Sequence, residues 1–511
     1  MLDTPGMGRV EPSPDEFSGT YDSGTAQVVW TKLVADLETP VSAFLKLAEE
    51  CPYSFLLESV EGGAVRGRYS IIGFDPDVIW RANGDEAEIN SSPEDVDSRY
   101  EPCGNGTLDA LRDLLAESHI DLPEDLPPMA AGVFGYMGYD TVRLVEKLPH
   151  FNPDPIGIPD AIFIRPTIMV IFDAVTDELT AVTPVRPVKD ISADNAYNRA
   201  SERLRDALFR LDAALPHSAR LDRSAVAHPE PVSNTTPATY MGMVRKAKDY
   251  IEAGDIFQVV LSQRFSAPFA LPPFSLYRAL RRVTPSPFLY YLRLDGFSVV
   301  GSSPEILVRS RGGEVTIRPI AGTRPRGETK KRDAELAKEP LENEKARPEH
   351  LMLLDLGRND VGRVARIGTV QVTDSFFLEY YSQVMHIVSN VIGALDPAHD
   401  AIDALMAGFP AGTVSGAPKV RAMEIIDELE HEKRGIYAGC VGYFSANGDM
   451  DSCIVLRTSL VKDGVMHVQA GAGIVADSVP ESEQAECQNK AKALFRAAEV
   501  AVRFATGSNQ D

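Results

Sequence analysis

The segment of residues 347–360 combines helical spacing with a carboxylate among apolar side chains. Glu349 falls on the same helical face as Met352, Leu353 and Leu356, at the i, i+3, i+4 and i+7 positions. A carboxylate buried on that face is costly without a cation, so a metal ion or a basic group should face it. The alternative is a first-turn glutamate that only complements the helix dipole. The segment alone leaves both explanations open.

A second carboxylate face occurs in the last helical pattern of the chain. Glu483, Glu486 and Lys490 lie at i, i+3 and i+7, so they share one face. Inward carboxylates on two separate helices, without a Cys or His cluster, are the ligands that a hard cation such as Mg²⁺ prefers. For Glu486 alone, a solvated row of ion pairs is an equally good explanation.

Glycine-rich turns and one arginine indicate a small anionic substrate. Residues 321–327, 408–419 and 471–473 could each bind an anion through backbone N–H groups. None has the spacing of a phosphate-binding loop, which disfavours a nucleotide. Arg457 lies in an apolar strand-like segment, where a guanidinium requires a carboxylate from the protein or from a ligand. His386, alone in a strand-like segment, has the pattern of an ordinary core histidine.

Composition and charge exclude several classes of protein. A formal net charge of −23 argues against nucleic acid or an anionic membrane as a partner. The five cysteines have no CxxC spacing, which argues against a zinc site and against a disulfide framework. The chain starts without a signal-peptide pattern, and no apolar segment approaches the length of a membrane span. We expect a cytoplasmic protein.

The elements that must position these residues divide into two predicted domains. Residues 1–25 are rich in Pro, Gly, Ser and Asp and predict a flexible tail. Residues 26–214 predict an N-terminal domain, residues 215–238 a linker, and residues 239–506 a second domain.

Within the first predicted domain, a strand ending at Glu58 and Ser59 runs into a glycine turn and a second strand, as in a hairpin. These two residues could contact a ligand, although an ordinary polar pair at a strand end is the more frequent case.

Six motifs together resemble the chorismate-utilising enzymes and, within them, the family of anthranilate synthase large subunits (component I). They lie at residues 56–59, 134–140, 254–263, 319–327, 349–360 and 408–419. The resemblance covers nearly the whole chain after residue 25. It implies a two-lobed α/β fold of the α+β type, with large antiparallel sheets flanking a central cleft and helices outside.

The resemblance also assigns roles to individual residues. Glu349 and Glu486 match the ligands of a Mg²⁺ cofactor, with Glu483 close enough to assist through water. Glu305, His386 and Thr413 match polar residues around the reacting ring. The residues that match the cradle for chorismate are Gly322, Thr323, Tyr437, Arg457, Gly471, Ala472, Gly473 and Lys490.

The activity implied by this resemblance has two steps. Ammonia adds to the chorismate ring as the hydroxyl group leaves, and pyruvate is then eliminated to give anthranilate, in the first committed step of tryptophan biosynthesis. Glu305 is expected to assist departure of the hydroxyl, and His386 the proton movements of elimination.

Two positions separate the close relatives. Relatives that activate water carry a lysine where this chain has Gln258, and the aminodeoxychorismate synthase relatives typically carry a lysine in place of Ala321. Both positions favour anthranilate over the alternative of aminodeoxychorismate. A catalytically silent tryptophan-binding regulator is a further alternative, which the retained Glu349, Glu486 and His386 disfavour.

Two partners follow from the resemblance. None of the cysteines lies on the Gly-flanked turn of a glutamine-hydrolysing nucleophile, so a separate glutamine amidotransferase subunit should supply ammonia. Tryptophan should act as feedback inhibitor in an allosteric pocket formed by Glu58, Ser59, Pro287, Phe288 and Leu289. The segment 284–289 departs from the family's usual Asn-Pro-Ser-Pro-Tyr-Met at Thr284, Phe288 and Leu289.

Overall fold

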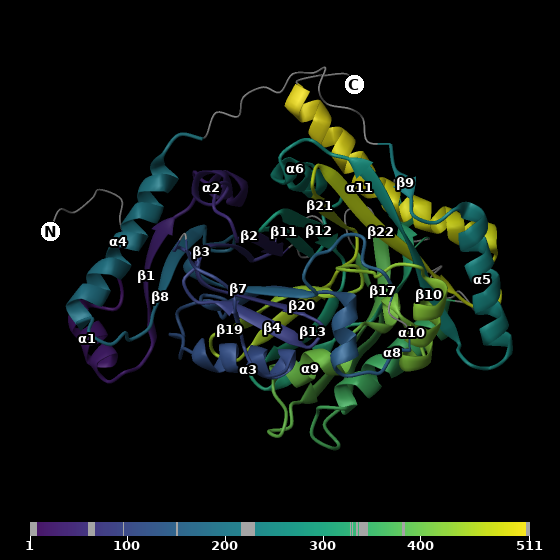
Figure 1. Cartoon of the computed structure of the whole chain (residues 1–511), viewed down its shortest axis with the longest axis horizontal. Coiled ribbons are helices and arrows are strands. Elements are labelled where there is room, and N and C mark those ends of the chain that lie inside the picture. The colour runs from purple at the N-terminus through teal and green to yellow at the C-terminus, as the bar shows by residue number, and fades with distance from the viewer. Residues whose placement is uncertain are drawn as a thin grey trace.

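The computed structural model describes residues 8–59, 67–95, 97–149, 152–215, 230–327, 329, 331–333, 336, 346–380 and 384–506. Strands fill the interior of the molecule and helices lie around its outside (Figure 1). Every strand pairing among the described residues is antiparallel, and these pairings join all of the strands into one large sheet. The predicted α/β class, with large antiparallel sheets and outer helices, is confirmed.

The strands have the following bounds: β1 (Gln27–Val34), β2 (Ser54–Ser59), β3 (Tyr69–Asn83), β4 (Glu86–Asn90), β5 (Glu101–Pro102), β6 (Gly132–Met137), β7 (Ala161–Asp173), β8 (Glu178–Val185), β9 (Val232–Ser233), β10 (Gln258–Pro268), β11 (Phe288–Leu294), β12 (Phe297–Ser303), β13 (Ile306–Arg311), β14 (Glu314–Ile317), β15 (Ile320–Pro325), β16 (Gln371–Tyr380), β17 (Val384–Ala394), β18 (Gly416–Ala417), β19 (Cys440–Ser445), β20 (Met450–Ile454), β21 (Thr458–Lys462) and β22 (Val465–Ile474).

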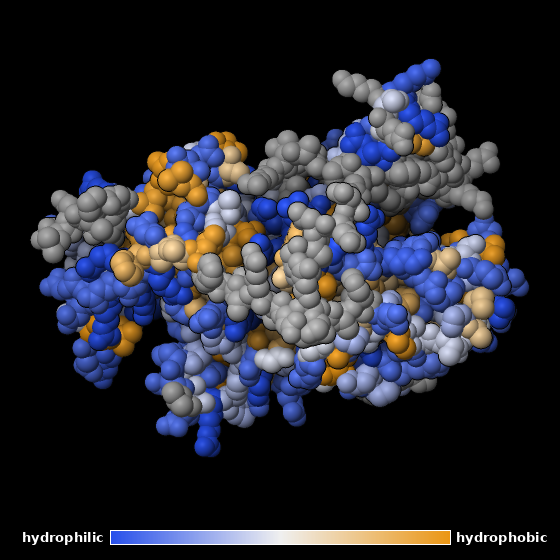
Figure 2. Space-filling model, turned by 90° about the horizontal axis from the view of Figure 1, so that it is seen from above, coloured by the Kyte–Doolittle hydropathy of each residue, from blue (hydrophilic) through white to orange (hydrophobic). Residues whose placement is uncertain are grey.

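The helices have the following bounds: α1 (Pro14–Asp22), α2 (Pro40–Leu47), α3 (Thr107–Glu117), α4 (Ala193–Asp212), α5 (Pro237–Glu252), α6 (Pro273–Val283), α8 (Ala346–Gly362), α9 (Ala401–Gly408), α10 (Lys419–Leu429) and α11 (Pro480–Thr506), with short 3₁₀ helices η1 (Tyr139–Leu144) and η3 (Gly412–Val414). None of the helices described is both long and apolar enough to pass through a bilayer. Figure 2 shows hydrophilic residues over most of the described part of one face, with hydrophobic residues in small groups.

The N-terminal segment differs from the expected flexible tail. Residues 14–22 form α1, which begins with a capping box in which Ser13 and Glu16 each accept from the other's backbone N–H. Phe17 is fully buried and packs edge-on against Tyr197 of α4, with the ring centroids 5.2 Å apart. The flexible-tail prediction is therefore wrong for this helix, because two aromatic side chains, Phe17 and Tyr21, anchor it. Residues 1–7 lie outside the described residues.

The sheet crosses the predicted domain boundary. β2 pairs with β11, and β6 pairs with β19, so strands from both predicted domains hydrogen-bond to one another. Residues 216–229 of the predicted linker lie outside the described residues, and its last part contains β9, which pairs with β10. The division at 215–238 stays a prediction.

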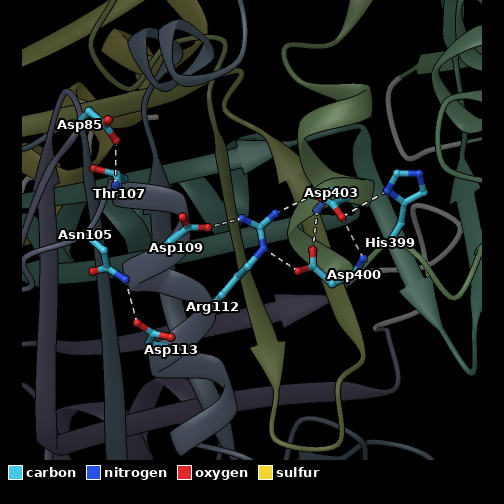
Figure 3. Close-up of polar contacts among 9 residues, drawn as sticks. All are labelled: Asp85, Asn105, Thr107, Asp109, Arg112, Asp113, His399, Asp400 and Asp403. Atoms are coloured by element: carbon cyan, nitrogen blue, oxygen red, sulfur yellow. Dashed lines mark hydrogen bonds and ion pairs between the residues drawn. The ribbon is translucent and has the colours of Figure 1, made fainter.

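Side chains also connect the two predicted domains on the outer surface. Arg112 of α3 forms ion pairs with Asp400 and Asp403 at the start of α9, each at 2.7 Å, and with Asp109 at 2.9 Å (Figure 3). His399 lies beside Asp403, with Nδ1 3.3 Å from Oδ2. These groups are at least partly exposed, so each pair contributes at most about 1 kcal/mol to stability.

The five cysteines are all free thiols.

Candidate active site

Two antiparallel strands and one helix form the first wall of the site. β10 pairs with β22 so that Val260 lies opposite Gly473 and Ser262 opposite Gly471. Lys490 of α11 donates from Nζ to the carbonyl oxygen of Gly471 at 2.8 Å. The same Nζ forms an ion pair with Glu486 Oε1 at 2.7 Å. Lys490 thus fixes the carboxylate face of α11 against the glycine segment of β22.

Side chains lie close against the glycines of β22. A Cβ on Gly473 would lie 2.4 Å from Gln258 Nε2, and a Cβ on Gly471 would lie 2.8 Å from Tyr437 Oη. Ala472 between them is fully buried. Gln258 Oε1 is buried and has no hydrogen-bond partner within the part of the chain that the structure describes. An acceptor free to bind a ligand therefore faces this wall.

A bulge in β15 forms the opposite wall. Ala321 pairs with Ile387 and Arg324 with Met385, so two residues of β15, at positions 322 and 323, face the single residue His386 of β17. Gly322 has a φ of 62°, a left-handed conformation that glycine adopts without the Cβ penalty. The bulge turns backbone groups of β15 toward His386. The side chain of Thr323 lies outside the described part of the structure.

Glu305 is the most perturbed carboxyl group of the site. Burial raises its pKa to about 8, although the Ile320 N–H at 3.4 Å, the Thr413 hydroxyl and the charge of Arg457 all oppose this rise. Thr413 Oγ1 has no partner of good hydrogen-bonding geometry among the described residues. Glu305 therefore holds a proton at neutral pH.

The pKa of His386 is displaced in the opposite direction from that of Glu305. Its side chain is 2% exposed, and burial together with the positive charge of Arg457 lowers its pKa to about 4. The imidazole is therefore neutral at pH 7 and has a nitrogen able to accept a proton. The prediction of an ordinary core histidine is right about burial, and His386 also lies opposite the bulge of β15 and near the charge of Arg457.

The positive charge of Arg457 lowers the pKa values of both Glu305 and His386. Arg457 lies between β20 and β21 rather than inside a strand, so the prediction of a strand position is wrong. Its φ is +47°, a left-handed conformation that costs a non-glycine residue about 1–3 kcal/mol. Burial lowers its pKa while the nearby Glu305 raises it. A strained, largely buried guanidinium is an observation that favours binding of an anion.

Glu349 does not lie on the buried face of α8, and that part of the prediction is wrong. The helix itself is confirmed, but its buried positions are His350, Leu353, Leu354, Gly357, Asp360 and Val361, and Glu349 is exposed. Its pKa is raised by partial loss of water and by the charge of Glu486, and lowered by Lys490. The two carboxylates therefore approach each other from α8 and α11. His350 and Asp360 are the buried polar residues of this helix, and neither was predicted as such.

The donor set at this junction fits a hard cation. Glu349, Glu486 and Glu483 are carboxylates, and the pKa of Glu483 is raised by loss of water and then by Glu486, against a hydrogen bond from Ser478. Carboxylates that repel one another are stabilised when a cation binds between them. Among the described residues, no three His, Cys, Asp or Glu side chains cluster tightly enough to enclose a metal alone. Water or substrate oxygens would have to complete the coordination.

Buried ion pairs behind the walls were also missed by sequence reasoning. Arg434 pairs with Glu430 at 2.6 Å and donates to the carbonyl oxygens of Val414 and Val260 at 2.7 Å each. Glu430 Oε1 also accepts from the Ser262 N–H at 2.7 Å. These bonds connect β10 with η3, which carries Thr413. The i, i+4 Glu–Arg spacing was the available signal.

A cavity of about 360 Å³, termed here the effector cavity, lies away from these walls. The ladder between β2 and β11 brings Ser59 opposite Phe288 and Glu58 opposite Leu289, and these four residues line the cavity. Pro287 does not line this cavity. The lining residues are Leu57, Glu58, Ser59, Arg68, Tyr69, Ile71, Met129, Phe288, Leu289, Tyr290, Arg309, Arg311, Val441, Gly442, Tyr443, Asp451, Ser452 and Cys453.

Glu58 has a structural role in this region. Its carboxylate accepts from Arg281 Nε at 2.7 Å and Nη2 at 2.9 Å, and from the Tyr277 hydroxyl. A neighbouring cavity of about 400 Å³ shares Glu58, Ser59 and Leu289. That second cavity is lined by many acidic side chains, namely Asp36, Glu38, Asp173, Asp177 and Glu178.

Comparisons with known proteins agree with this geometry. Residues 55–496 match the family model described as chorismate binding enzyme. The chain is 56% identical to anthranilate synthase component 1 of Cereibacter sphaeroides, over 96% of this chain and 98% of that protein. It is 48% identical to the protein of that name from Thermus thermophilus, over 92% and 97% of the two chains.

A solved structure is also similar. The crystal structure of anthranilate synthase component I from Streptococcus pneumoniae TIGR4 superposes with a TM-score of 0.74 at 36% identity, covering 91% of this chain and 98% of that one. Because identity, coverage and fold agree, this chain belongs to the chorismate-binding enzymes and, within them, to the anthranilate synthase component I family.

Proposed function

We propose that this chain converts chorismate and ammonia to anthranilate, pyruvate and water. The pairing of a protonated Glu305 with a neutral His386 near Arg457 is the observation that carries this proposal. The two groups are already in the protonation states that an acid and a base need at neutral pH. The relatives named anthranilate synthase component 1 favour this reaction over aminodeoxychorismate formation and over a silent regulator.

In the first step, Glu305 donates its proton to the departing ring hydroxyl, which leaves as water while ammonia adds to the ring. Gln258 supports the choice of nucleophile, because its free Oε1 can accept a hydrogen bond from ammonia but a neutral amide cannot deprotonate water. In the second step, His386 accepts the ring proton as the bond between the ring and the enolpyruvyl oxygen breaks, and the released enolate takes up a proton at its methylene carbon to give pyruvate. Arg457 and the backbone of β22 hold the carboxylates of the substrate.

Mg²⁺ is the proposed cofactor, held by Glu349 and Glu486 with assistance from Glu483. When bound, the ion neutralises the ring carboxylate and the charge that develops near it. The support from the chain is the junction of carboxylates from α8 and α11, which repel one another in the absence of a cation.

The ammonia is proposed to come from a separate glutamine amidotransferase subunit. The name component 1 of the relatives implies a second component. Three of the five cysteines are buried, and burial raises the pKa of each of these three thiols, which opposes formation of a nucleophilic thiolate. The isolated chain should therefore use ammonium salts but not glutamine.

Tryptophan is the proposed feedback inhibitor, bound in the effector cavity. The cavity volume lies in the range of small-molecule sites. Apolar side chains such as Leu57 and Phe288 can enclose an indole, and the Oδ1 atom of Asp451 is a buried acceptor without a partner among the described residues. The neighbouring cavity is less suitable, because its carboxylates would repel the carboxylate of an amino acid.

The activity is tested by incubating the purified chain with chorismate, Mg²⁺ and ammonium while following anthranilate fluorescence. Anthranilate should form with ammonium, increase toward alkaline pH as free ammonia increases, and be absent with glutamine until an amidotransferase subunit is added. Glutamine-dependent turnover by the chain alone would overturn the assignment of the partner, and isochorismate as the product would overturn the reaction.

The proposed role of His386 in the second step is tested with the variant His386→Ala. This variant should accumulate an aminated intermediate that still carries the pyruvyl group, because addition of ammonia does not need the imidazole and elimination does. Mass spectrometry of the quenched reaction distinguishes the intermediate from anthranilate. Unchanged anthranilate output would remove His386 from the second step.

A further inference from the structure

Tyr290 of β11 lies between the effector cavity and the active site. Its ring lines that cavity next to Phe288, and its side chain is only 1% exposed. Its hydroxyl oxygen lies 2.5 Å from Oγ1 of Thr458, the first residue of β21. Thr458 follows Arg457 directly, so a single hydrogen bond separates a wall of the cavity from the turn that carries the site's arginine.

The direction of this hydrogen bond can be assigned. The Thr458 hydroxyl donates to the carbonyl oxygen of Leu456 at 2.8 Å, because a carbonyl can only accept. Since that bond uses the only proton of the Thr458 hydroxyl, the Tyr290 hydroxyl must donate to Thr458 Oγ1. The two bonds form a series from Tyr290 through Thr458 to Leu456.

This series holds a strained turn closed. Leu456 and Thr458 flank Arg457, whose φ of +47° is unfavourable for a residue with a Cβ. The carbonyl oxygen of Arg457 also accepts from the Ser302 N–H at 3.2 Å. Strained conformations persist only where the surroundings determine them, and these hydrogen bonds are such surroundings.

The sheet also makes room for the tyrosine ring. Tyr290 pairs with Gly301 of β12, and a Cβ on Gly301 would lie 2.2 Å from two ring atoms and 2.5 Å from the hydroxyl oxygen. The ring therefore lies flat over this glycine.

We propose that Tyr290 is a positioning residue for Arg457, and that it transmits occupancy of the effector cavity to the substrate site. The proposal rests on the proposed function, in which Arg457 holds a carboxylate of chorismate and the cavity binds tryptophan. A ligand in the cavity contacts the ring of Tyr290, shifts its hydroxyl from Thr458, and releases the turn. Arg457 then loses the orientation in which it binds substrate.

The test compares three variants with a matched control. Tyr290→Phe removes only the hydroxyl, and Thr458→Val removes the middle of the series, whereas Thr458→Ser retains its hydroxyl. The control is Tyr291→Phe, because the neighbouring Tyr291 contacts Ser298 at 3.4 Å and does not line the effector cavity. For each variant, kcat, KM for chorismate, the concentration of tryptophan that halves the rate, and the thermal midpoint are measured.

We expect Tyr290→Phe and Thr458→Val to raise KM for chorismate roughly 3- to 10-fold, the effect of one net hydrogen bond, with kcat within about twofold of the parent. Inhibition by tryptophan should weaken in both variants although tryptophan still binds. Thr458→Ser and Tyr291→Phe should match the parent. A merely structural role would lower the thermal midpoint without this separation of KM from kcat.

An unchanged KM and unchanged inhibition in Tyr290→Phe would overturn the proposal, as would an equal effect of Tyr291→Phe. Equilibrium binding of chorismate to the parent and to Tyr290→Phe, measured without ammonia, tests the orientation of Arg457 separately from turnover. If the parent binds chorismate but forms no anthranilate, the proposed function fails while this comparison still decides the role of Tyr290.

Discussion

Buried carboxyl groups are neutral in the active site but ion-paired in the effector cavity. In the active site, Glu305 and His386 are buried with their pKa values displaced toward the neutral forms, and Arg457 is held in a strained turn. In the effector cavity, Glu58 is paired with Arg281, and Asp451 with Arg309 and Arg311 at 3.0 and 2.8 Å. Neutral groups can exchange protons with a substrate, whereas paired charges form a fixed surface. The first region is therefore suited to proton transfer, and the second to binding without proton transfer.

The largest expected effect is at the carboxylate junction. Glu349→Gln and Glu486→Gln should each abolish Mg²⁺-dependent turnover while the fold is retained, because an amide replaces a hard anionic ligand. The measurements are anthranilate formation across a Mg²⁺ titration and direct Mg²⁺ binding by calorimetry. Near-normal activity of either variant at moderate Mg²⁺ would show that the junction is not the metal site.

The next largest effects are expected from substituting two buried glutamates, Glu305 and Glu58. Glu305→Gln should lower kcat roughly 10²- to 10⁴-fold, the typical contribution of a general acid. It should also stabilise the protein, because the raised pKa of Glu305 means that its charged form opposes folding. Glu58→Gln should instead destabilise the protein by about 3 kcal/mol, because it leaves Arg281 without its partner.

Thermal or urea unfolding of both variants from pH 5 to pH 9 checks the contrast. Glu305 holds its proton in the folded state up to about pH 8 but loses it near its ordinary pKa of 4.5 in the unfolded state. Stability from this group is therefore full below pH 4.5 and decreases as the pH rises toward 8, by about 1.4 kcal/mol for each unit of the displacement. The free energy of unfolding of Glu305→Gln should therefore increasingly exceed that of the parent as the pH rises over that range. A difference that does not change with pH would contradict the raised pKa of Glu305.

The pH dependence of catalysis should follow the same two groups. With free ammonia held constant, kcat/KM for chorismate should be level at neutral pH and decrease about tenfold per unit above pH 8, as Glu305 loses its proton. His386 is protonated only below about pH 4, so no decrease from this group is expected between pH 5 and 7. A decrease through pH 6.5 would indicate a histidine of ordinary pKa.

The smallest effect is expected in the effector cavity. Ser59→Ala should weaken inhibition by tryptophan roughly 3- to 10-fold, through loss of one hydrogen-bonding group, with the uninhibited rate unchanged. Ser70→Ala is the matched control, because Ser70 lines the neighbouring acidic cavity and not the effector cavity. An effect of Ser70→Ala alone would place tryptophan in the other cavity.

Prediction from the sequence succeeded where local spacing determines structure. The helix around Glu349, the strand ending at Glu58 and Ser59, and the last helix with Glu486 and Lys490 all follow from periodicity and capping signals. The resemblance to the family assigned residues more than 100 positions apart in the sequence, such as Glu305 and Arg457, to one site. Spacing alone could not do this, because their proximity depends on long-range strand pairing.

The predictions that were wrong, for Glu349 and for the N-terminal residues, also have physical causes. Glu349 faces the open junction because His350 occupies the buried position, where its Nε2 lies 2.6 Å from the Ser389 hydroxyl oxygen. Helical spacing alone did not distinguish these adjacent positions. The N-terminal residues were taken as flexible on composition, although Ser13 and Glu16 have the spacing of a capping box and Phe17 an apolar place to pack.

The glycines of β22 restrict how this enzyme can evolve. Gly473 lies against the amide of Gln258, the residue proposed to distinguish ammonia from water, and Gly471 lies against the hydroxyl of Tyr437. A single base change in any glycine codon that alters the residue introduces a side chain with a Cβ or ends the chain. Each such change at position 473 would therefore displace the amide of Gln258. Selection on the proposed choice of nucleophile would therefore act on Gly473 as well as on Gln258.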